Sequence, residues 1–336
     1  MDPFLFNFKF ELIFFWEYIA SVMTEQNNPF HKKKSGVFFF KSSNPYEFYD
    51  LLNGIDMEPK QDVWGTLIFP ENTKLPCPVI VPIHGSAGLR EGHHTHMVNL
   101  LEAGFAVFRI HHFESRGVIS IVENQTQVTL ATMITDAFRA LSLLNKHPDI
   151  DKNKIGIMGW SLGGSTALYS AWQPIIDALT TGDEKFSAYL PLYPGALLKP
   201  EDNRWSNAPM HILFGEDDDY TPLSLCKKLI DYIKPARDVE LTVYPNAHHS
   251  FDSIDPVEFI PYAIKLKDMF IDLKKDGRQV YTDENNNTFY LDNKEERFRL
   301  IKETPNLLGA HAGGNWTARK QSHQDVVDFF SKQFFS

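Results

Sequence analysis

The sequence predicts an α/β fold with a mostly parallel, twisted sheet and helices on both faces. The first observation is that short apolar runs of strand length alternate with segments whose apolar residues recur every three to four positions. The second is an apolar fraction of 43%, which is typical of a globular chain with a sizeable core. A chain of 336 residues is long for one domain, but α/β folds of this size often stay single.

Residues 35–336 are predicted to form this domain, and each element has its own signal. Residues 37–40 and 63–68 have the pattern of antiparallel strands that open the sheet. A helix around residues 97–101 precedes the next core strand, and the apolar spacing of residues 128–144 predicts a long helix packed on the sheet. Further buried strands are predicted from their apolar runs, at 78–83, 105–110, 155–158, 210–214 and 239–244.

The pattern loosens after residue 273. We expect residues 274–316 to be a surface insertion, with strands at 279–281 and 288–291 forming a hairpin. One hypothesis is that this insertion overhangs the site as a partial lid. The last helix is predicted over residues 317–335, and its inward residues would be Val326, Val327, Phe329 and Phe330.

Residues 1–34 are predicted to be an N-terminal extension. Residues 3–22 are rich in Phe, Leu and Ile, but they lack the basic start of a signal peptide and are interrupted by Lys9, Glu11 and Glu17. Two interpretations remain open, an upstream over-extension of the reading frame ahead of Met23 or an interfacial helix that contacts a membrane. The expected location is cytoplasmic.

Charge and cysteine usage exclude some function classes. A formal net charge of −10 argues against nucleic acid and against anionic membrane surfaces as partners. Cys77 and Cys226 are expected to be free thiols, because one pair in so long a chain is no disulfide framework. His93, His94 and His96 have no carboxylate or cysteine at ligand spacing, so no metal site is predicted.

The strongest functional motif is the stretch Gly159-Trp160-Ser161-Leu162-Gly163. It follows the buried strand at 155–158 and leads into a helical segment, so it is predicted to be a sharp turn between strand and helix. A serine at the apex of such a turn is exposed above the sheet, next to the N–H groups at the start of the helix. Ser161 is therefore the predicted nucleophile.

A nucleophilic serine needs a base and an acid that orients the base. The spacing G-x-x-D-x-x-T-P after strand 210–214 favours Asp218 as the acid, with Asp219 as the alternative. After strand 239–244, the Ser-Phe pair that follows His249 favours His249 as the base over His248. The three residues follow one another along the chain in the order Ser, Asp, His. This is the order found in folds that place a nucleophilic serine on a sharp turn between a strand and a helix.

A second turn is predicted to complete an oxyanion hole. The buried strand at 78–83 runs into His84-Gly85-Ser86-Ala87-Gly88, a turn that presents a backbone N–H to a tetrahedral intermediate. The first N–H donor is assigned to Ser86, with Ala87 as the neighbouring possibility. The second donor is the N–H of Leu162.

Several nearby side chains are candidates for substrate contact. Trp160 and Tyr220 flank catalytic positions and are expected to shape the pocket. Arg116 either binds a substrate carboxylate in a bidentate fashion or braces its own loop. His111 and His112 follow a core strand, and they either face solvent or contribute one substrate contact.

Together these motifs resemble the α/β-hydrolase superfamily, and in particular its dienelactone-hydrolase-like serine hydrolases. The resemblance covers about residues 60–270, and it rests on the five stretches 84–88, 113–117, 159–164, 215–222 and 247–251. It implies hydrolysis of a small or medium-sized ester without a cofactor. Two positions depart from the family, which has cysteine in place of Ser161 and often has aspartate where this chain has His111-His112.

The predicted function is therefore that of a serine hydrolase that cleaves a small-molecule carboxylic ester. His249, oriented by Asp218, would remove the proton of Ser161 as an acyl-enzyme forms. A serine peptidase and an acyltransferase remain alternatives on the same fold, and a non-catalytic binding protein is an alternative from another class.

Overall fold

A computed structural model describes residues 35–336, except 72, 183, 284 and 306. The predicted N-terminal extension, residues 1–34, and its apolar segment 3–22 lie outside the described residues. None of the helices in the described part of the chain is long and apolar enough to cross a membrane.

The core of the molecule is an 8-stranded sheet with the strand order β1-β2-β4-β3-β5-β6-β8-β9. Only β1 with β2 and β2 with β4 pair antiparallel, and the remaining neighbours are parallel, which confirms the predicted sheet and its antiparallel opening. The strands are β1 (Gly36–Ser42), β2 (Gln61–Ile68), β3 (Cys77–Ile83), β4 (Ala106–Ile110), β5 (Ile150–Trp160), β6 (Ala188–Leu192), β8 (His211–Gly215) and β9 (Glu240–Tyr244).

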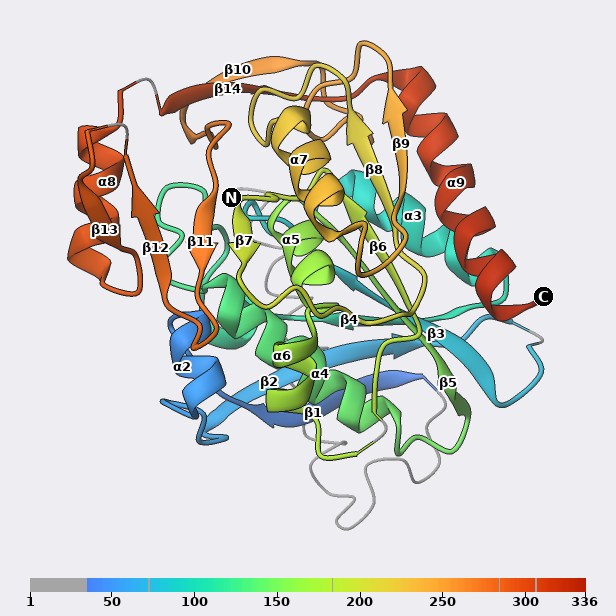
Figure 1. The fold of residues 1–336 in the computed structure, drawn as a ribbon. Helices are drawn as coiled ribbons and strands as arrows, with labels where there is room; N and C mark the ends of the chain where they lie inside the picture. Colours follow the sequence, from blue (N-terminus) through green and yellow to red (C-terminus); the bar gives the residue numbers. More distant parts are fainter. Residues whose placement is uncertain (1–34, 72, 183, 284, 306) are drawn as a thin grey trace, which may run out of the picture. The chain divides into compact units, whose positions relative to one another are not determined.

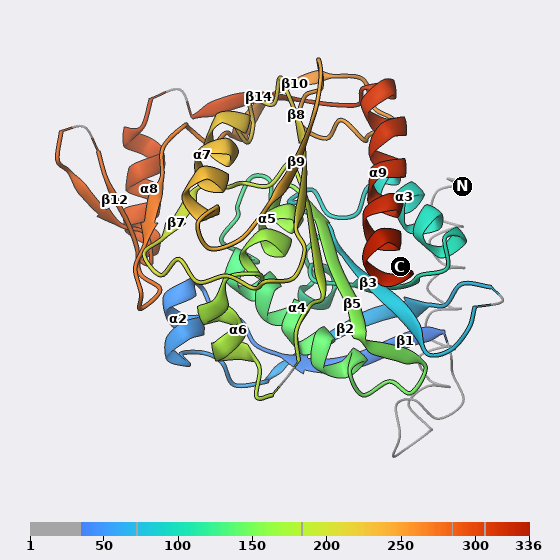
Figure 2. The ribbon, with the colours of Figure 1, turned by 45° about the vertical axis from the view of Figure 1, so that its right-hand side comes forward.

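Helices cover both faces of this sheet (Figures 1 and 2). Helices α3 and α9 lie on one face, and α4 and α5 lie on the other. The helical segments are α2 (Phe48–Asn53), α3 (Glu91–Glu102), η1 (Glu114–Arg116), α4 (Leu130–Leu144), α5 (Leu162–Tyr169), α6 (Gln173–Leu179), α7 (Leu223–Ile233), α8 (Lys294–Glu303) and α9 (Trp316–Phe334).

Caps and apolar faces explain where the two long helices lie. The Thr129 hydroxyl accepts a hydrogen bond from the Thr132 N–H and begins α4, whose apolar face is buried against the sheet. Asn315 caps α9 through the N–H of Ala318 at 3.0 Å. Phe330 of α9 packs over Gly156 of β5, where a side chain would collide with its ring. Val327, which was expected to face inward, is only half-buried, because it lies at the edge of the buried face.

The described part of the chain also forms two smaller sheets in addition to the 8-stranded one. One pairs β10 (Glu258–Ile264) with β14 (Leu308–Ala312), and the other has the order β13-β12-β11-β7. The latter contains β7 (Leu198–Pro200), β11 (Ile271–Leu273), β12 (Gln279–Thr282) and β13 (Thr288–Tyr290). Strands β12 and β13 pair antiparallel, as the predicted hairpin requires. Residues 274–316, the expected insertion, thus share their sheets with strands that precede residue 274.

Candidate active site

Ser161 occupies a sharp turn between β5 and α5. Its backbone has φ 55° and ψ −114°, a conformation that is strained for a residue with a side chain. The Ser161 N–H donates a hydrogen bond of 3.0 Å to the carbonyl of Leu192 on β6, which ties the turn to the sheet. Strain of this kind persists only where the surrounding structure holds it, and here it presents the serine hydroxyl to the pocket.

The glycines of the motif allow this turn because the backbone is crowded on every side. A Cβ on Gly159 would lie 2.2 Å from the carbonyl oxygen of Gly163. A Cβ on Gly163 would lie 1.9 Å from the carbonyl oxygen of Ile83, and one on Gly164 would lie 2.4 Å from that of Leu192. Helix α5 can therefore approach β3 and β6 closely only without side chains at these positions.

Ser161, His249 and Asp218 form one continuous hydrogen-bonded chain. The Nε2 atom of His249 lies 2.9 Å from the Ser161 hydroxyl, and its Nδ1 atom lies 2.8 Å from the Asp218 carboxylate. Because an ionised carboxylate only accepts hydrogen bonds, Nδ1 is the donor and Nε2 is left to accept the serine proton. The Asp218 carboxylate is buried and also accepts the N–H groups of Tyr220 and Thr221, at 2.9 and 2.8 Å.

The two alternative residues have other partners. Asp219 accepts hydrogen bonds from the ring and the backbone N–H of His311 on β14, at 2.9 and 2.8 Å. The ring of His248 lies 5.7 Å from the ring of His311. Of each pair, His249 is thus the histidine that contacts Ser161, and Asp218 is the acid that contacts His249.

A buried network of side chains packs against the ring of His249, and the sequence did not indicate it. The ring of Tyr193 packs edge-on against the His249 ring with their centroids 4.7 Å apart. The Tyr193 hydroxyl donates to Asp252 at 2.6 Å, and Asp252 also binds His96 Nε2 at 3.1 Å. Burial alone would raise the pKa of Asp252, but His96 and Tyr193 outweigh it and hold that pKa well below its usual range. Asp252 is therefore ionised, and it holds Tyr193 in place against the imidazole.

The turn formed by residues 84–88, here called the Ser86 turn, lies directly beside Ser161. It is closed by a hydrogen bond of 3.0 Å from the Gly88 N–H to the Gly85 carbonyl, which leaves the N–H of Ser86 out of the turn bond. A Cβ on Gly85 would lie 3.3 Å from the Cβ of Ser161, so the two turns touch. Leu162 is the first residue of α5, where the backbone N–H has no partner within the helix. Ser86 and Leu162 line the same pocket as Ser161.

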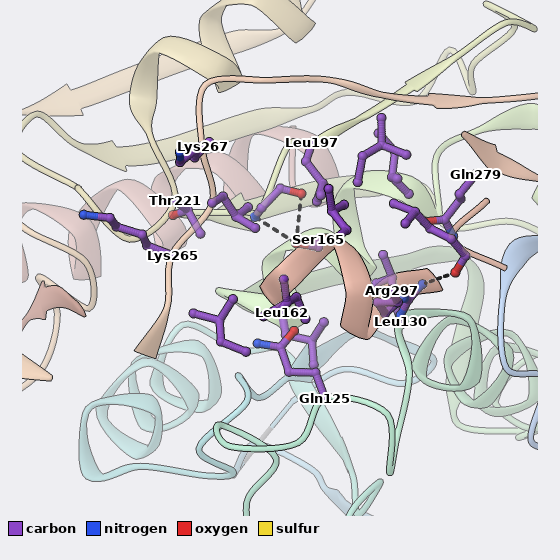
Figure 3. A pocket seen from close by; sticks show the side chains of 18 of the residues that line it. Gln125, Leu130, Leu162, Ser165, Leu197, Thr221, Lys265, Lys267, Gln279 and Arg297 are labelled. Atoms are coloured by element: carbon purple, nitrogen blue, oxygen red, sulfur yellow. Dashed lines mark hydrogen bonds between the residues drawn. The ribbon is translucent and has the colours of Figure 1, made fainter. Parts of the chain in front are cut away.

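Next to Ser161 lies a cavity of about 240 Å³ with mainly apolar walls. Figure 3 shows side chains from well-separated parts of the chain around it, among them Leu130, Leu162 and Leu197. Tyr220 lines it, as the sequence predicted. Several wall residues come from 274–316, the segment expected to overhang the site, namely Gln279, Leu291, Arg297, Leu300, Ile301 and Leu307.

Trp160 is not part of this wall, contrary to expectation. Its side chain is fully buried and stacks on the ring of His93, with their centroids 4.1 Å apart. Trp160 is the last residue of β5, and its side chain lies against α3, which covers the other face of the sheet from α5. Its position next to Ser161 in the sequence misled the prediction, because neighbouring residues along a strand face opposite sides.

Arg116 braces its loop and does not line the pocket. Its guanidinium binds both oxygens of buried Asp136, at 2.8 and 3.0 Å, and the carbonyl of His112 at 2.9 Å. The His112 ring also binds Asp136 at 2.8 Å and is fully buried, so the expectation that it faces solvent or substrate is wrong. His111 stacks on the ring of Trp64 instead. The sequence around Arg116 and His112 does not reveal these contacts, because their shared partner Asp136 lies on α4.

The histidines near residue 93 also have structural partners. His93 stacks on Trp160, and His96 binds Asp252. Within the described ranges, no group of three or more His, Cys, Asp or Glu side chains could hold a metal ion. Cys77 and Cys226 are buried free thiols, as expected.

Comparisons with known proteins agree with this architecture. The model of the dienelactone hydrolase family matches residues 63–265, more than half of the chain. No curated protein was found to match the chain. Among solved structures, a dienelactone hydrolase-like promiscuous phosphotriesterase from metagenomic libraries is 16% identical and has a TM-score of 0.51, with 89% of this chain and 99% of that chain covered. That likeness shows the fold.

Two further solved structures are more distant. Esterase 2 of Thermogutta terrifontis is 17% identical with a TM-score of 0.49, with 67% of this chain and 88% of that chain covered. The protein Est1E of Butyrivibrio proteoclasticus is 17% identical with a TM-score of 0.43, with 64% of this chain and 90% of that chain covered. The match of the family model over residues 63–265 shows that this chain belongs to the dienelactone hydrolase family.

Proposed function

We propose that this protein is a serine hydrolase that cleaves a carboxylic ester of small to medium size through an acyl-enzyme. One observation carries the proposal, namely the unbroken hydrogen-bonded chain from Asp218 through His249 to Ser161, with the serine held in a strained turn. A nucleophile within hydrogen-bond reach of a base, and a base oriented by a third group, is the arrangement that acyl transfer needs.

In the first half of the reaction, the Ser161 hydroxyl attacks the ester carbonyl while His249 Nε2 takes its proton. Asp218 keeps the imidazole in the required tautomer and stabilises the positive charge that forms on it. The negative charge on the former carbonyl oxygen is held by the N–H groups of Ser86 and Leu162. Each such donor contributes roughly 10²–10³ in rate.

The second half of the reaction releases both products. His249 gives its proton to the leaving alcohol, which departs and leaves the acyl group on Ser161. A water molecule then transfers a proton to His249 and attacks the acyl-enzyme, and the acid leaves as the Ser161 hydroxyl is restored. These steps need no cofactor. The apolar pocket beside Ser161 supports a substrate with an apolar acyl or alcohol part.

The test is hydrolysis of p-nitrophenyl esters from acetate to decanoate by the wild type and by Ser161→Ala and His249→Ala. Turnover by the wild type and a loss of about 10⁶ in kcat for Ser161→Ala are expected. Ser187→Ala is the matched control, because Ser187 bonds to the carbonyl of Asn153 and does not line the pocket. A folded wild type that cleaves none of these esters and does not react with a fluorophosphonate probe would refute the proposal.

A further inference from the structure

The pocket holds a charged cluster that the proposed reaction does not use. Glu47, Gln279 and Arg297 all line the cavity. The Arg297 guanidinium and the Gln279 amide both donate hydrogen bonds to the Glu47 carboxylate. Arg297 also donates to the carbonyl of Leu291 at 3.0 Å. We call these three residues the polar cluster.

The polar cluster and Thr221 lie on different sides of the pocket. In Figure 3, Gln279 and Arg297 stand on one side of the pocket and Thr221 on the other. Thr221 marks the catalytic side, because its hydroxyl lies 3.0 Å from the Asp218 carboxylate and 3.2 Å from His249 Nδ1. Leucine side chains lie between the two sides in that view, those of Leu162 and Leu197.

The free energy of folding does not by itself explain why a charge pair lies in a mainly apolar wall. The Glu47 side chain is 5% exposed, and that of Arg297 is 23% exposed. Burial raises the pKa of Glu47 to about 7, although Arg297 and Gln279 oppose that rise. Replacing a buried ion pair with apolar residues of similar volume is often neutral or even stabilising. A role in ligand recognition explains why the pair faces the cavity.

The position of the cluster in the sequence agrees with a role in substrate choice. Glu47 directly precedes α2, Gln279 lies on β12 and Arg297 lies on α8. All three lie outside residues 63–265, the part that matches the family model. The catalytic chain of hydrogen bonds lies inside that part, so the cluster belongs to segments that are additional to the shared core.

The chemistry of the cluster selects one kind of ligand group. Glu47 accepts hydrogen bonds and Arg297 donates them, and when Glu47 is ionised the two charges cancel. A hydroxyl both donates and accepts, so it can bind to both without bringing a charge. A ligand carboxylate or ammonium group would be attracted by one member of the pair and repelled by the other, so little attraction is left to offset the loss of its own hydration. An alkyl end would cover the exposed part of the Arg297 side chain and return no hydrogen bond, which is costly.

We propose that this pocket selects esters with a hydroxyl group at the end remote from the ester bond, and that Glu47 and Arg297 bind this hydroxyl. The inference rests on the proposed esterase function and names its substrate class. Arg297, Glu47 and Gln279 act here as specificity-determining residues, while Ser161 performs the chemistry.

The test compares kcat/KM for matched esters that differ only in the terminal hydroxyl. One series is p-nitrophenyl ω-hydroxyalkanoates against p-nitrophenyl alkanoates, and the other is diol monoacetates against n-alkyl acetates. A preference of about tenfold or more for the hydroxylated ester is expected at the optimal length in one series, because polar groups built to bind a hydroxyl reject its absence. In the double variant Glu47→Leu/Arg297→Met the preference should fall to one or below.

Arg299→Met is the matched control for this experiment. Arg299 lies on the same helix, pairs with Glu296 and does not line the pocket, so its removal should leave the hydroxyl preference unchanged. If the double variant does not fold, the single variant Arg297→Met takes its place, because Glu47 can then be buried as the neutral acid. For this variant too the preference should fall.

The possible results separate the two proposals. An active wild type without hydroxyl preference in either series, or a preference that survives in the pocket variant, overturns this inference and leaves the esterase function intact. If no ester is cleaved, the esterase proposal fails, and calorimetry on Ser161→Ala decides the inference alone. Tighter binding of methyl ω-hydroxyoctanoate than of methyl octanoate would support the hydroxyl site, and equal binding would overturn it.

Discussion

Replacing Gly163 by alanine is expected to damage both the stability and the activity of this protein. The added Cβ would lie 1.9 Å from the carbonyl oxygen of Ile83, 2.6 Å from its carbonyl carbon and 2.7 Å from the carbonyl oxygen of His84. These atoms belong to the backbone at the end of β3, so no side-chain rotation can relieve the contact. Either α5 or the end of β3 must move by about 1 Å to restore ordinary contact.

The magnitude follows from this displacement. Forcing one carbon into a packed core costs about 1–3 kcal/mol, and a contact with rigid backbone places Gly163→Ala near 3 kcal/mol. At about 2 °C per kcal/mol for a domain of this size, Tm should fall by about 6 °C. The backbone that moves leads into the Ser86 turn, and a misplacement of about 1 Å at a reacting centre can cost 10²-fold in rate.

The assay is thermal unfolding by circular dichroism together with kcat/KM on a p-nitrophenyl ester that the wild type cleaves. Gly182→Ala is the matched control, because a Cβ at Gly182 meets no atom within 4 Å and should change neither quantity. A Gly163→Ala variant with Tm within 1 °C of the control and activity within a factor of two would refute the packing argument for the turn.

Three further predictions concern the acid, the bracing arginine and the thiols. Asp218→Asn should lower kcat by about 10⁴ while circular dichroism stays unchanged, because asparagine favours the wrong His249 tautomer. Arg116→Met should destabilise by about 3 kcal/mol in denaturant unfolding, since the buried Asp136 loses the guanidinium and keeps the hydrogen bonds of His112 and Ser42, yet leave KM unchanged. The exposed Arg204→Met should cost under about 1 kcal/mol, and equal losses would contradict the bracing role. Burial raises the pKa of Cys77 to about 11 and that of Cys226 further, so neither thiol should react with Ellman's reagent at pH 8 until guanidinium unfolds the chain.

Much of the fold could be predicted because its signals are local. The apolar run of β5, the glycines after it and the spacing of α4 and α9 all act over a few residues, where strand and helix periods decide which side chains face the core. The parallel sheet follows from their alternation, because parallel strands need a crossover that a helix supplies. The candidate residues Ser161, Asp218 and His249 were also found by local motifs.

Other features depend on partners far away in the sequence. The sequence allows two roles for Arg116, and only the structure places its guanidinium on Asp136. The sequence also predicts that Trp160 lines the pocket, although it packs on His93. In both, the sequence shows the residue but not the partner that it meets. The local spacing favours Asp218 over Asp219, but it does not show what Asp219 binds, because that partner, His311, lies on a strand 92 positions further along the chain.

The sequence by itself determined the fold class, most strands of the core sheet and the three residues that we propose for the chemistry, Ser161, Asp218 and His249. Only the tertiary structure decided the pocket. Glu47 and Arg297 are 250 positions apart, and neither stands in a local pattern that points to the other. Periodicity and turn chemistry act between neighbours in the sequence, whereas a pocket wall is formed when distant segments pack together and bury their side chains in a common cavity.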